Sequence, residues 1–135
     1  MLLDDGLELL SEADCRSLLA SGSIGRVGVT VGALPVILPV NYAYVDGGIV
    51  FRTAEGTKLR AAVDRAVIAF EVDHYDEDLR DGWSVLAVGR AVEVDGEGER
   101  EAYRALGLAP WADGTRTHYV RMEPEMLTGR RIVGE

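Results

Sequence analysis

Apolar and polar residues alternate along much of this chain, which is the pattern of β-strands with one buried face. In residues 26–31 every second position is a valine, and the intervening positions are polar or glycine. Residues 36–45 repeat the pattern with five apolar side chains on one face: Val36, Leu38, Val40, Tyr42 and Tyr44. Both segments are therefore predicted to be strands with one face in a core.

Two features of these segments concern their surroundings. Pro39 removes a backbone donor from within the second strand, so we expect an edge, a bulge or a place where something other than a strand approaches. Asp46 and Gly47, in "VDGGI", form a dipeptide typical of tight hairpin turns. A third strand over Ile49 to Thr53 is predicted to follow.

The rest of the chain continues this arrangement. Helices are predicted from Ser11, as N-cap, to Gly22, from near Gly56 to residue 65, and from Glu97 to Leu106. Further strands are predicted over residues 66–73, 82–94, 116–124 and 127–133. Because hairpins join most strands and strands do not alternate regularly with helices, the fold class is mainly β, an antiparallel barrel with short helices in one domain, 1–135.

Composition limits the class of protein. The 135 residues are 47% hydrophobic and 27% charged, as in a globular domain. The opening residues resemble no signal peptide, and no apolar run approaches the roughly 18 residues of a membrane span, so we expect a cytoplasmic protein without a membrane partner. The single cysteine, Cys15, excludes an internal disulfide and a zinc site of paired thiolates.

Charge is uneven along the chain. A net charge of −9 argues against a nucleic-acid partner, because clustered basic side chains supply most of that binding energy. Residues 52–65 nevertheless hold four basic and two acidic side chains, whereas residues 73–81 hold five acidic and one basic. A positive segment in a negative protein suits a small anion.

Several common motifs are absent. Gly22, Gly25 and Gly28 precede a strand instead of opening a helix, so they are not a dinucleotide fingerprint. "GTK" lacks the other elements of a P-loop, and "GWSVL" lacks the second glycine of a nucleophile elbow. The two histidines, His74 and His118, are expected at the surface, and no metal site is predicted.

One stretch, "GIVFRTAEGTKL", has the chemistry of an anion site. Arg52 and Thr53 end a strand, Gly56 lets the backbone approach closely, and Thr57 and Lys58 open a helix. Side chains and the amide groups of the first helical turn can converge there on a phosphate. Lys58 is the single lysine of the chain and adds a flexible point charge. The other reading is a capped helix with a solvated basic face.

At this point the chain resembles a known family. The segments "LPVNYAYVDGGIVFRTAEGTKLRAA", "VIAFEVD", "GWSVLAVGRAVEV" and "PWADGTRTHYVRMEPEMLTGRRIV" occur in order over nearly the whole chain. Together they resemble the pyridoxamine 5'-phosphate oxidase-like FMN-binding split-barrel family, in particular the small branch that includes nitroimidazole-resistance-type proteins. The resemblance implies a split β-barrel, a homodimer, and FMN bound between the subunits.

The resemblance also implies roles for individual positions. Phosphate contacts are implied for Arg52, Thr53 and Lys58, with Leu59 beside them. The ribityl chain and ring would meet Pro39, Val40, Asn41 and Tyr42, largely through backbone groups. The ring would meet Trp83 and Ser84, from the same subunit or its partner. Arg121, Arg130 and Arg131 are weaker candidates, for which solvent exposure is the preferred interpretation.

Function is less closely defined. Related nitroimidazole-resistance-type proteins often have histidine at the position of Arg52, so their chemistry is not predicted here. The principal prediction is an FMN-dependent oxidoreductase acting on a small organic substrate. The alternatives are a split-barrel reductase that uses the deazaflavin F420, and a non-catalytic flavin-binding or haem-binding module, with His118 as the haem candidate.

Overall fold

The computed structural model describes residues 7–54, 57–63, 65–109 and 117–132. Eight strands are found in this part of the chain: β1 Glu8–Leu9, β2 Ile24–Val31, β3 Leu34–Val45, β4 Gly48–Ala54, β5 Val67–Asp76, β6 Asp81–Glu93, β7 Thr117–Met122 and β8 Met126–Ile132. The helices of this part are α1 Glu12–Ser21, α2 Lys58–Val63 and α3 Glu97–Arg104. None of its helices is long and apolar enough to cross a membrane.

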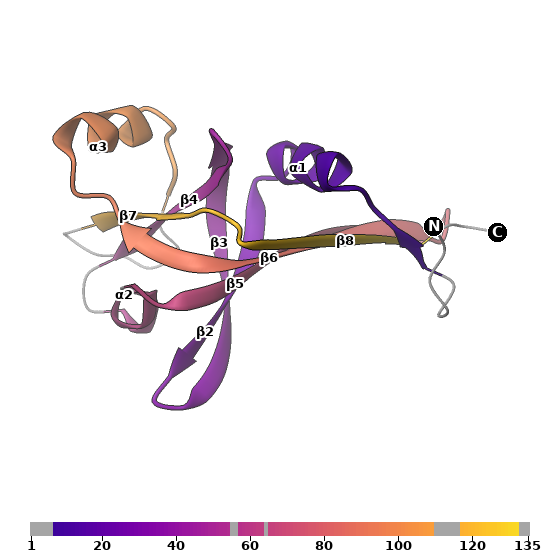
Figure 1. Ribbon diagram of the computed structural model, residues 1–135, viewed down its shortest axis with the longest axis horizontal. Helices are drawn as coiled ribbons and strands as arrows, with labels where there is room; N and C mark the ends of the chain where they lie inside the picture. Colours follow the sequence, from indigo (N-terminus) through magenta and orange to yellow (C-terminus); the bar gives the residue numbers. More distant parts are fainter. Residues whose placement is uncertain (1–6, 55–56, 64, 110–116, 133–135) are drawn as a thin grey trace.

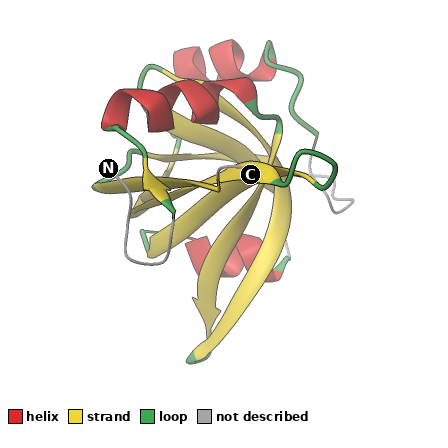
Figure 2. Ribbon diagram, turned by 90° about the vertical axis from the view of Figure 1, so that its right-hand side faces the viewer, coloured by secondary structure: helices red, strands yellow, loops and turns green. Residues whose placement is uncertain are grey.

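The strands form an antiparallel barrel. Their order is β1-β8-β6-β5-β2-β3-β4-β7, and β7 also pairs with β6, so the strands from β6 to β7 close into a ring (Figure 1). The end of the long β6 pairs with β7 in the barrel. Its earlier part pairs with β5 and β8 in an extension of the sheet, to which β1 is added beside β8. Figure 2 shows α1 and α3 on one side of the strands and α2 on the other. The predicted fold class is confirmed, and β1 is the one strand that the sequence pattern did not predict.

The alternating side chains fill the barrel as the sequence pattern indicates. Val27 and Val29 of β2 belong to one core cluster with Val40 and Tyr42 of β3. The Tyr42 and Phe70 rings meet edge to face with centroids 4.7 Å apart. A second, smaller cluster lies outside the barrel wall beneath α3: Val50, Val94, Tyr103, Leu108 and Tyr119. Both faces of β4 are therefore buried.

Local signals set the turns and the first helix. Asp46 and Gly47 both have positive φ, at 49° and 81°, as the predicted Asp-Gly turn requires. Ser11 caps α1, because its Oγ accepts a hydrogen bond from the Asp14 amide at 3.1 Å. In α2, Leu59 and Val63 lie one turn apart and pack against the barrel core, so this short helix covers the barrel between β4 and β5.

Among the residues that the structure describes, none pairs with the outer half of β3 on the side away from β2. β2 pairs with Leu34–Asn41 on one side, whereas β4 pairs only with Tyr42–Val45 on the other. The Tyr42 amide donates to the Ser23 carbonyl at 3.0 Å, and antiparallel pairing alternates, so the amides of even-numbered residues face β2. The backbone amides at positions 35, 37, 39 and 41 therefore point toward the edge. Prolines, which have no amide hydrogen, occupy two of these positions. The edge predicted at Pro39 is confirmed.

Candidate functional site

The predicted β3 residues divide between the core and the open edge. Val40 and Tyr42 are 2% and 3% exposed and point into the barrel. The Tyr42 hydroxyl donates to the Leu19 carbonyl at 2.6 Å, and burial raises the pKa of Tyr42 to about 12. A ligand at this edge would thus meet the outward backbone groups of Pro39 and Asn41, because the amides of Val40 and Tyr42 face β2 and their side chains face the barrel interior. Asn41 already donates to the Ala109 carbonyl at 3.0 Å.

Arg52 and Thr53 occupy opposite faces of β4. Arg52 points away from the barrel interior, donates to the Leu108 carbonyl at 2.6 Å, and lies 5.5 Å from the centroid of the Tyr119 ring. Thr53 follows on the other face, which Phe51 and the barrel core share. Both side chains are expected from the sequence to contact one anion, but the alternation of the strand places them on opposite faces of β4.

Thr53 carries a buried hydroxyl group. Its side chain is 1% exposed, and within the described part of the chain its Oγ1 makes no hydrogen bond. Leaving a buried hydroxyl unsatisfied costs free energy, so such an atom at the end of a strand indicates a place where a ligand or water can supply the missing contact.

The start of α2 follows directly. Thr57 Oγ1 donates to the Ala54 carbonyl at 2.7 Å and accepts from the Arg60 amide at 3.1 Å, which makes Thr57 the capping residue of the helix. Lys58 is the first helical residue. Its side chain and the whole of Gly56 lie outside what the structure describes, so the predicted contribution of these two residues stays a prediction.

Trp83 and Ser84 are consecutive residues of β6, so their side chains point to opposite faces of the sheet. They lie on the flat extension of β6, where Trp83 is flanked by His74 of β5 and Arg131 of β8. Trp83 packs against the main core cluster, to which Cys15 and Leu19 of α1 also belong. A small pocket beside it, of about 220 Å³, is lined by Trp83, His74, Asp81, Gly82, Arg131 and Ile132. The start of β6, which carries both residues, lies at the opposite end of the molecule from α2 (Figure 1).

The late arginines differ from one another. Arg130 and Arg131 are exposed, as expected. Arg121 is not, because its side chain is only 18% exposed and donates to the Val45 and Asp46 carbonyls at 2.9 and 3.0 Å and to the Tyr103 hydroxyl at 3.2 Å. These bonds join β7 to the β3–β4 turn and to α3. The prediction of a solvated Arg121 is wrong, and its contacts give it a structural role.

Sequence reasoning missed a polar cluster at the end of the barrel beside α2. Glu93, at the end of β6, contacts Arg60 of α2 through Oε2 at 2.8 Å and His118 of β7 through Oε1. The three side chains are 16–20% exposed, so the expectation of a surface His118 is wrong, whereas His74 is exposed. His118 stands opposite Thr53 in the β4–β7 register. Within the described residues, the buried Arg60 Nε also lacks a hydrogen-bond partner.

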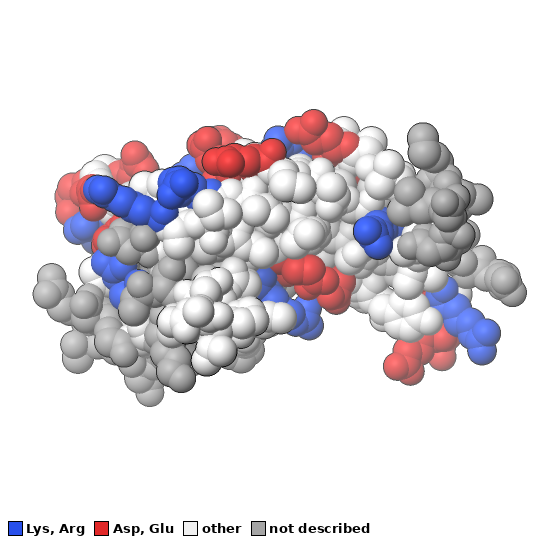
Figure 3. Space-filling view, turned by 60° about the horizontal axis from the view of Figure 1, so that its bottom comes forward, with Lys and Arg blue, Asp and Glu red and all other residues white. Residues whose placement is uncertain are grey.

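The outer face of the sheet is apolar with a charged group near its centre (Figure 3). A hollow of about 380 Å³ is lined by Gly28 and Ala69 between the exposed Ile37 and Leu86. The lining also includes Arg26, which bridges two carboxylates, Glu71 at 3.1 Å and Asp73 at 3.2 Å. Burial, followed by the hydrogen bond and charge of Asp73, raises the pKa of Glu71 to about 7, against the opposing effect of Arg26.

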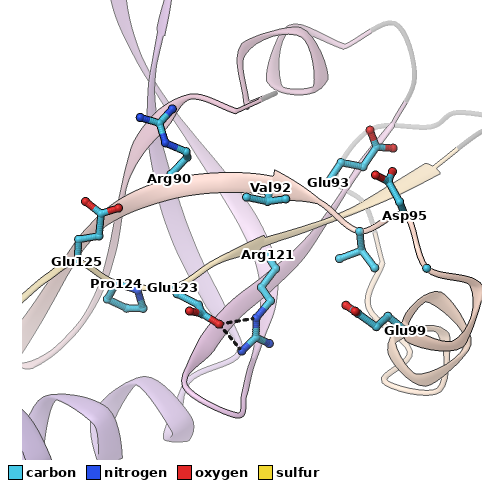
Figure 4. Close-up of a pocket in the computed structure, with 11 residues that line it drawn as sticks. Arg90, Val92, Glu93, Asp95, Glu99, Arg121, Glu123, Pro124 and Glu125 are labelled. Atoms are coloured by element: carbon cyan, nitrogen blue, oxygen red, sulfur yellow. Dashed lines mark hydrogen bonds and ion pairs between the residues drawn. The ribbon is translucent and has the colours of Figure 1, made fainter.

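A larger open pocket, of about 610 Å³, lies where the end of β6 meets the β7–β8 connection and α3 (Figure 4). Among its described lining residues, Arg121 is the one that the sequence offered as a candidate for the cofactor site. Figure 4 shows its guanidinium turned toward Glu123. Acidic side chains outnumber basic ones there: Glu93, Asp95, Glu99, Glu123 and Glu125 against Arg90 and Arg121. Such a lining repels an anion, so the β4–α2 corner is the better candidate for a phosphate.

Known proteins provide an independent comparison. Residues 11–131 match the family model described as pyridoxamine 5'-phosphate oxidase. The uncharacterized protein Rv0080 of Mycobacterium tuberculosis is 40% identical over 131 residues, which cover 93% of this chain and 86% of that protein. The solved FAD binding protein from Mycobacterium smegmatis is 38% identical, with a TM-score of 0.79 over 92% of this chain and 98% of the other.

A more distant structure shows the same fold. It is an FAD-binding protein from Mesorhizobium loti, 22% identical, with a TM-score of 0.75 over 93% of this chain and 97% of that one. The family match spans most of the residues that gave the resemblance in the sequence, and the barrel described above is the split barrel of these relatives. This chain therefore belongs to the pyridoxamine 5'-phosphate oxidase family.

Proposed function

We propose that this protein binds a flavin nucleotide at the corner formed by the open edge of β3, the end of β4 and the start of α2, and exchanges electrons with a small organic substrate there. The FAD-binding relative at 38% identity supports the flavin class. The edge of β3 supports a planar ligand, because Pro39 and Asn41 face outward and no described strand pairs beside them.

The main structural support is the unsatisfied Thr53 hydroxyl. It is buried one residue before the end of β4, α2 begins shortly afterwards at Lys58, and the described residues offer it no partner. A phosphate oxygen would accept its hydrogen bond, and a charged acceptor makes such a bond stronger than a neutral one. Thr53 and Lys58 would hold the phosphate, while Arg52 would contribute from the other face of β4 by fixing the Leu108 carbonyl.

The form of the cofactor is proposed more narrowly as FMN, because the family resemblance implies it. FAD carries a second phosphate and an adenosine, and F420 carries an acidic tail. All three share the tricyclic ring and a phosphate, so the same corner can be tested with each.

The proposed site also needs a second copy of the chain. Trp83 and Ser84 lie apart from the β4–α2 corner in one chain, so a partner subunit would supply them to the ring. The outer sheet face offers a surface for that partner. It combines the projecting β2–β3 hairpin, with Leu34 and Ile37 at 68% and 72% exposure, with the hollow over Gly28 and Ala69. A projection beside a hollow allows two identical faces to interlock about a two-fold axis.

The bound flavin would accept or donate a hydride or single electrons. The work of the chain itself would be to bind and orient. Thr53 and Lys58 would bind the phosphate, the β3 edge would position the ring, and the second copy would exclude water from it.

The proposal is tested by titrating purified protein with FMN, FAD, F420 and riboflavin, followed by fluorescence quenching. We expect FMN or FAD to bind in the micromolar range or tighter, and riboflavin, which lacks the phosphate, at least tenfold more weakly. Reduction of the bound flavin by NAD(P)H and reoxidation by an added acceptor would establish electron transfer. Binding of F420 alone would replace the flavin by the deazaflavin, and binding of none of the four would refute the proposal.

A further inference from the structure

Glu93 joins three separate parts of the fold. It ends β6, its Oε2 contacts Arg60 Nη2 of α2 at 2.8 Å, and its Oε1 contacts His118 Nδ1 of β7. The side-chain exposures of Arg60, Glu93 and His118 are 19%, 20% and 16%, so solvent screens these contacts less than it does the exposed ion pairs of α1 and α3. Both carboxylate oxygens are engaged.

The contact matters for α2 because that helix has only six residues. A helix of this length does not form on its own, so tertiary contacts must hold it. Leu59 and Val63 bury one face in the barrel core, and the Arg60–Glu93 pair fixes the neighbouring face. Two such attachments on different faces restrict both the sliding and the rotation of the helix.

The same helix begins with Lys58 and is capped by Thr57. Thr57 Oγ1 accepts a hydrogen bond from the Arg60 amide and donates to the Ala54 carbonyl, so Arg60 is linked through Thr57 to the end of β4. On the barrel side, His118 stands opposite Thr53 in the register of β4 and β7. Glu93 thus links, through one contact each, the helix that carries Lys58 and the strand beside Thr53.

We propose that Glu93 is a positioning residue for the cofactor phosphate: through Arg60 and His118 it sets the distance between the start of α2 and Thr53. This inference rests on the proposed function. It distinguishes Arg60, whose role is to hold Glu93, from Lys58, whose role is to contact the ligand. The same arrangement explains why the Glu93 carboxylate can lie near an anion site: Arg60 and His118 each contact one of its two oxygens.

A purely structural ion pair would affect stability alone. The distinguishing measurement is therefore the ratio of FMN affinity to riboflavin affinity, taken at a temperature well below unfolding and with far-UV circular dichroism as the check of folding. Riboflavin has the same ring and no phosphate. A loss of position at the phosphate corner must lower this ratio, whereas a general loosening of the barrel lowers both affinities together.

The variants are Glu93→Gln, which keeps the shape and removes the charge, and Arg60→Lys, which keeps the charge and removes the planar fork. We expect Glu93→Gln to lower FMN affinity tenfold or more with riboflavin binding unchanged, and Arg60→Lys to lower it less. Glu101→Gln, in the exposed pair with Arg104 on α3, is the matched control and should change neither affinity. If Glu93→Gln does not fold, Arg60→Lys and Arg60→Gln give the same comparison.

An unchanged ratio in the folded variants, or an equal fall for FMN and riboflavin, would overturn the positioning role. Failure of the wild-type protein to prefer FMN over riboflavin would instead refute the proposed phosphate site itself. The two failures are thus separate outcomes of one titration.

Discussion

Arg52 and Thr53 are adjacent in the chain, yet Arg52 lies against the Tyr119 ring outside the barrel wall while Thr53 is buried on the opposite face of β4. Their substitutions should therefore have different consequences, although both residues come from the same predicted motif.

Thr53→Val should weaken cofactor binding and strengthen the fold. Valine has nearly the same shape and removes a buried hydroxyl that makes no hydrogen bond with the described residues, which should raise the free energy of unfolding by about 1 kcal/mol. FMN affinity should fall by roughly tenfold, about 1.4 kcal/mol, through loss of one bond to a charged oxygen. Urea unfolding and FMN titration measure the two effects, and a loss of stability in Thr53→Val would contradict this account of the site.

Arg52→Ala should mainly destabilise the fold and should affect cofactor binding little. It removes the hydrogen bond to the Leu108 carbonyl and the contact with Tyr119, which together should cost about 1–2 kcal/mol of unfolding free energy. The effect on FMN affinity should be smaller than that of Thr53→Val. A larger effect on binding than on urea stability would place the Arg52 guanidinium directly on the ligand.

Lys58→Ala tests the phosphate contact itself. We expect FMN affinity to fall tenfold or more, a loss of about 1.5–3 kcal/mol, because a charge-assisted bond disappears. Alanine is a good helix former, so α2 and the fold should persist. Calorimetric titration with FMN, beside circular dichroism, measures both, and unchanged affinity would remove Lys58 from the site.

Glu71 should make stability depend on pH. Its pKa is about 7 in the folded protein against an ordinary value of 4.5, so between these pH values the folded state keeps a proton that the unfolded chain releases. The contribution of Glu71 to the free energy of unfolding is therefore fully present below pH 4.5 and is lost as the pH rises toward 7. Glu71→Gln should flatten this decline and raise the urea midpoint at pH 8. Equal slopes for wild type and variant from pH 5 to pH 8 would refute the assignment.

Ile37→Glu tests the proposed two-fold contact. Ile37 is 72% exposed, so a charge there should leave the monomer folded but oppose burial against a second copy. Sedimentation should show a dimer for the wild type and a monomer for Ile37→Glu, with weaker flavin binding because Trp83 of the second copy is lost. Leu106→Glu, at a position beyond α3 that is 42% exposed, should stay dimeric. A monomeric wild type would refute the contact.

Local patterns in the sequence predicted most of the fold. The alternation in β3, the Asp46–Gly47 turn and the Ser11 cap depend on residues that are neighbours in the chain, so their signals are visible without the structure. The site was harder to predict, because nearness in sequence is not nearness in space. The hairpin signal at Asp46 and Gly47 predicted the strand β4, and the alternation of side chains along that strand separates Arg52 from Thr53.

The cluster around Glu93 could not be predicted from any local signal. Arg60, Glu93 and His118 meet only because β7 closes the barrel against β6 and α2 covers its end. Each of the three is an ordinary charged or polar residue in its own segment. Their proximity is a property of the closed barrel and becomes visible only in three dimensions.

The prolines at positions 35 and 39 have a consequence for the behaviour of the protein in a crowded cell. An exposed strand edge is normally a template on which other chains add strands, and this leads to aggregation. Here half of the outward amides in that stretch are missing, so an incoming strand would find acceptors without matching donors. The molecule can leave β3 accessible to a small partner and still resist indefinite polymerisation through the same edge.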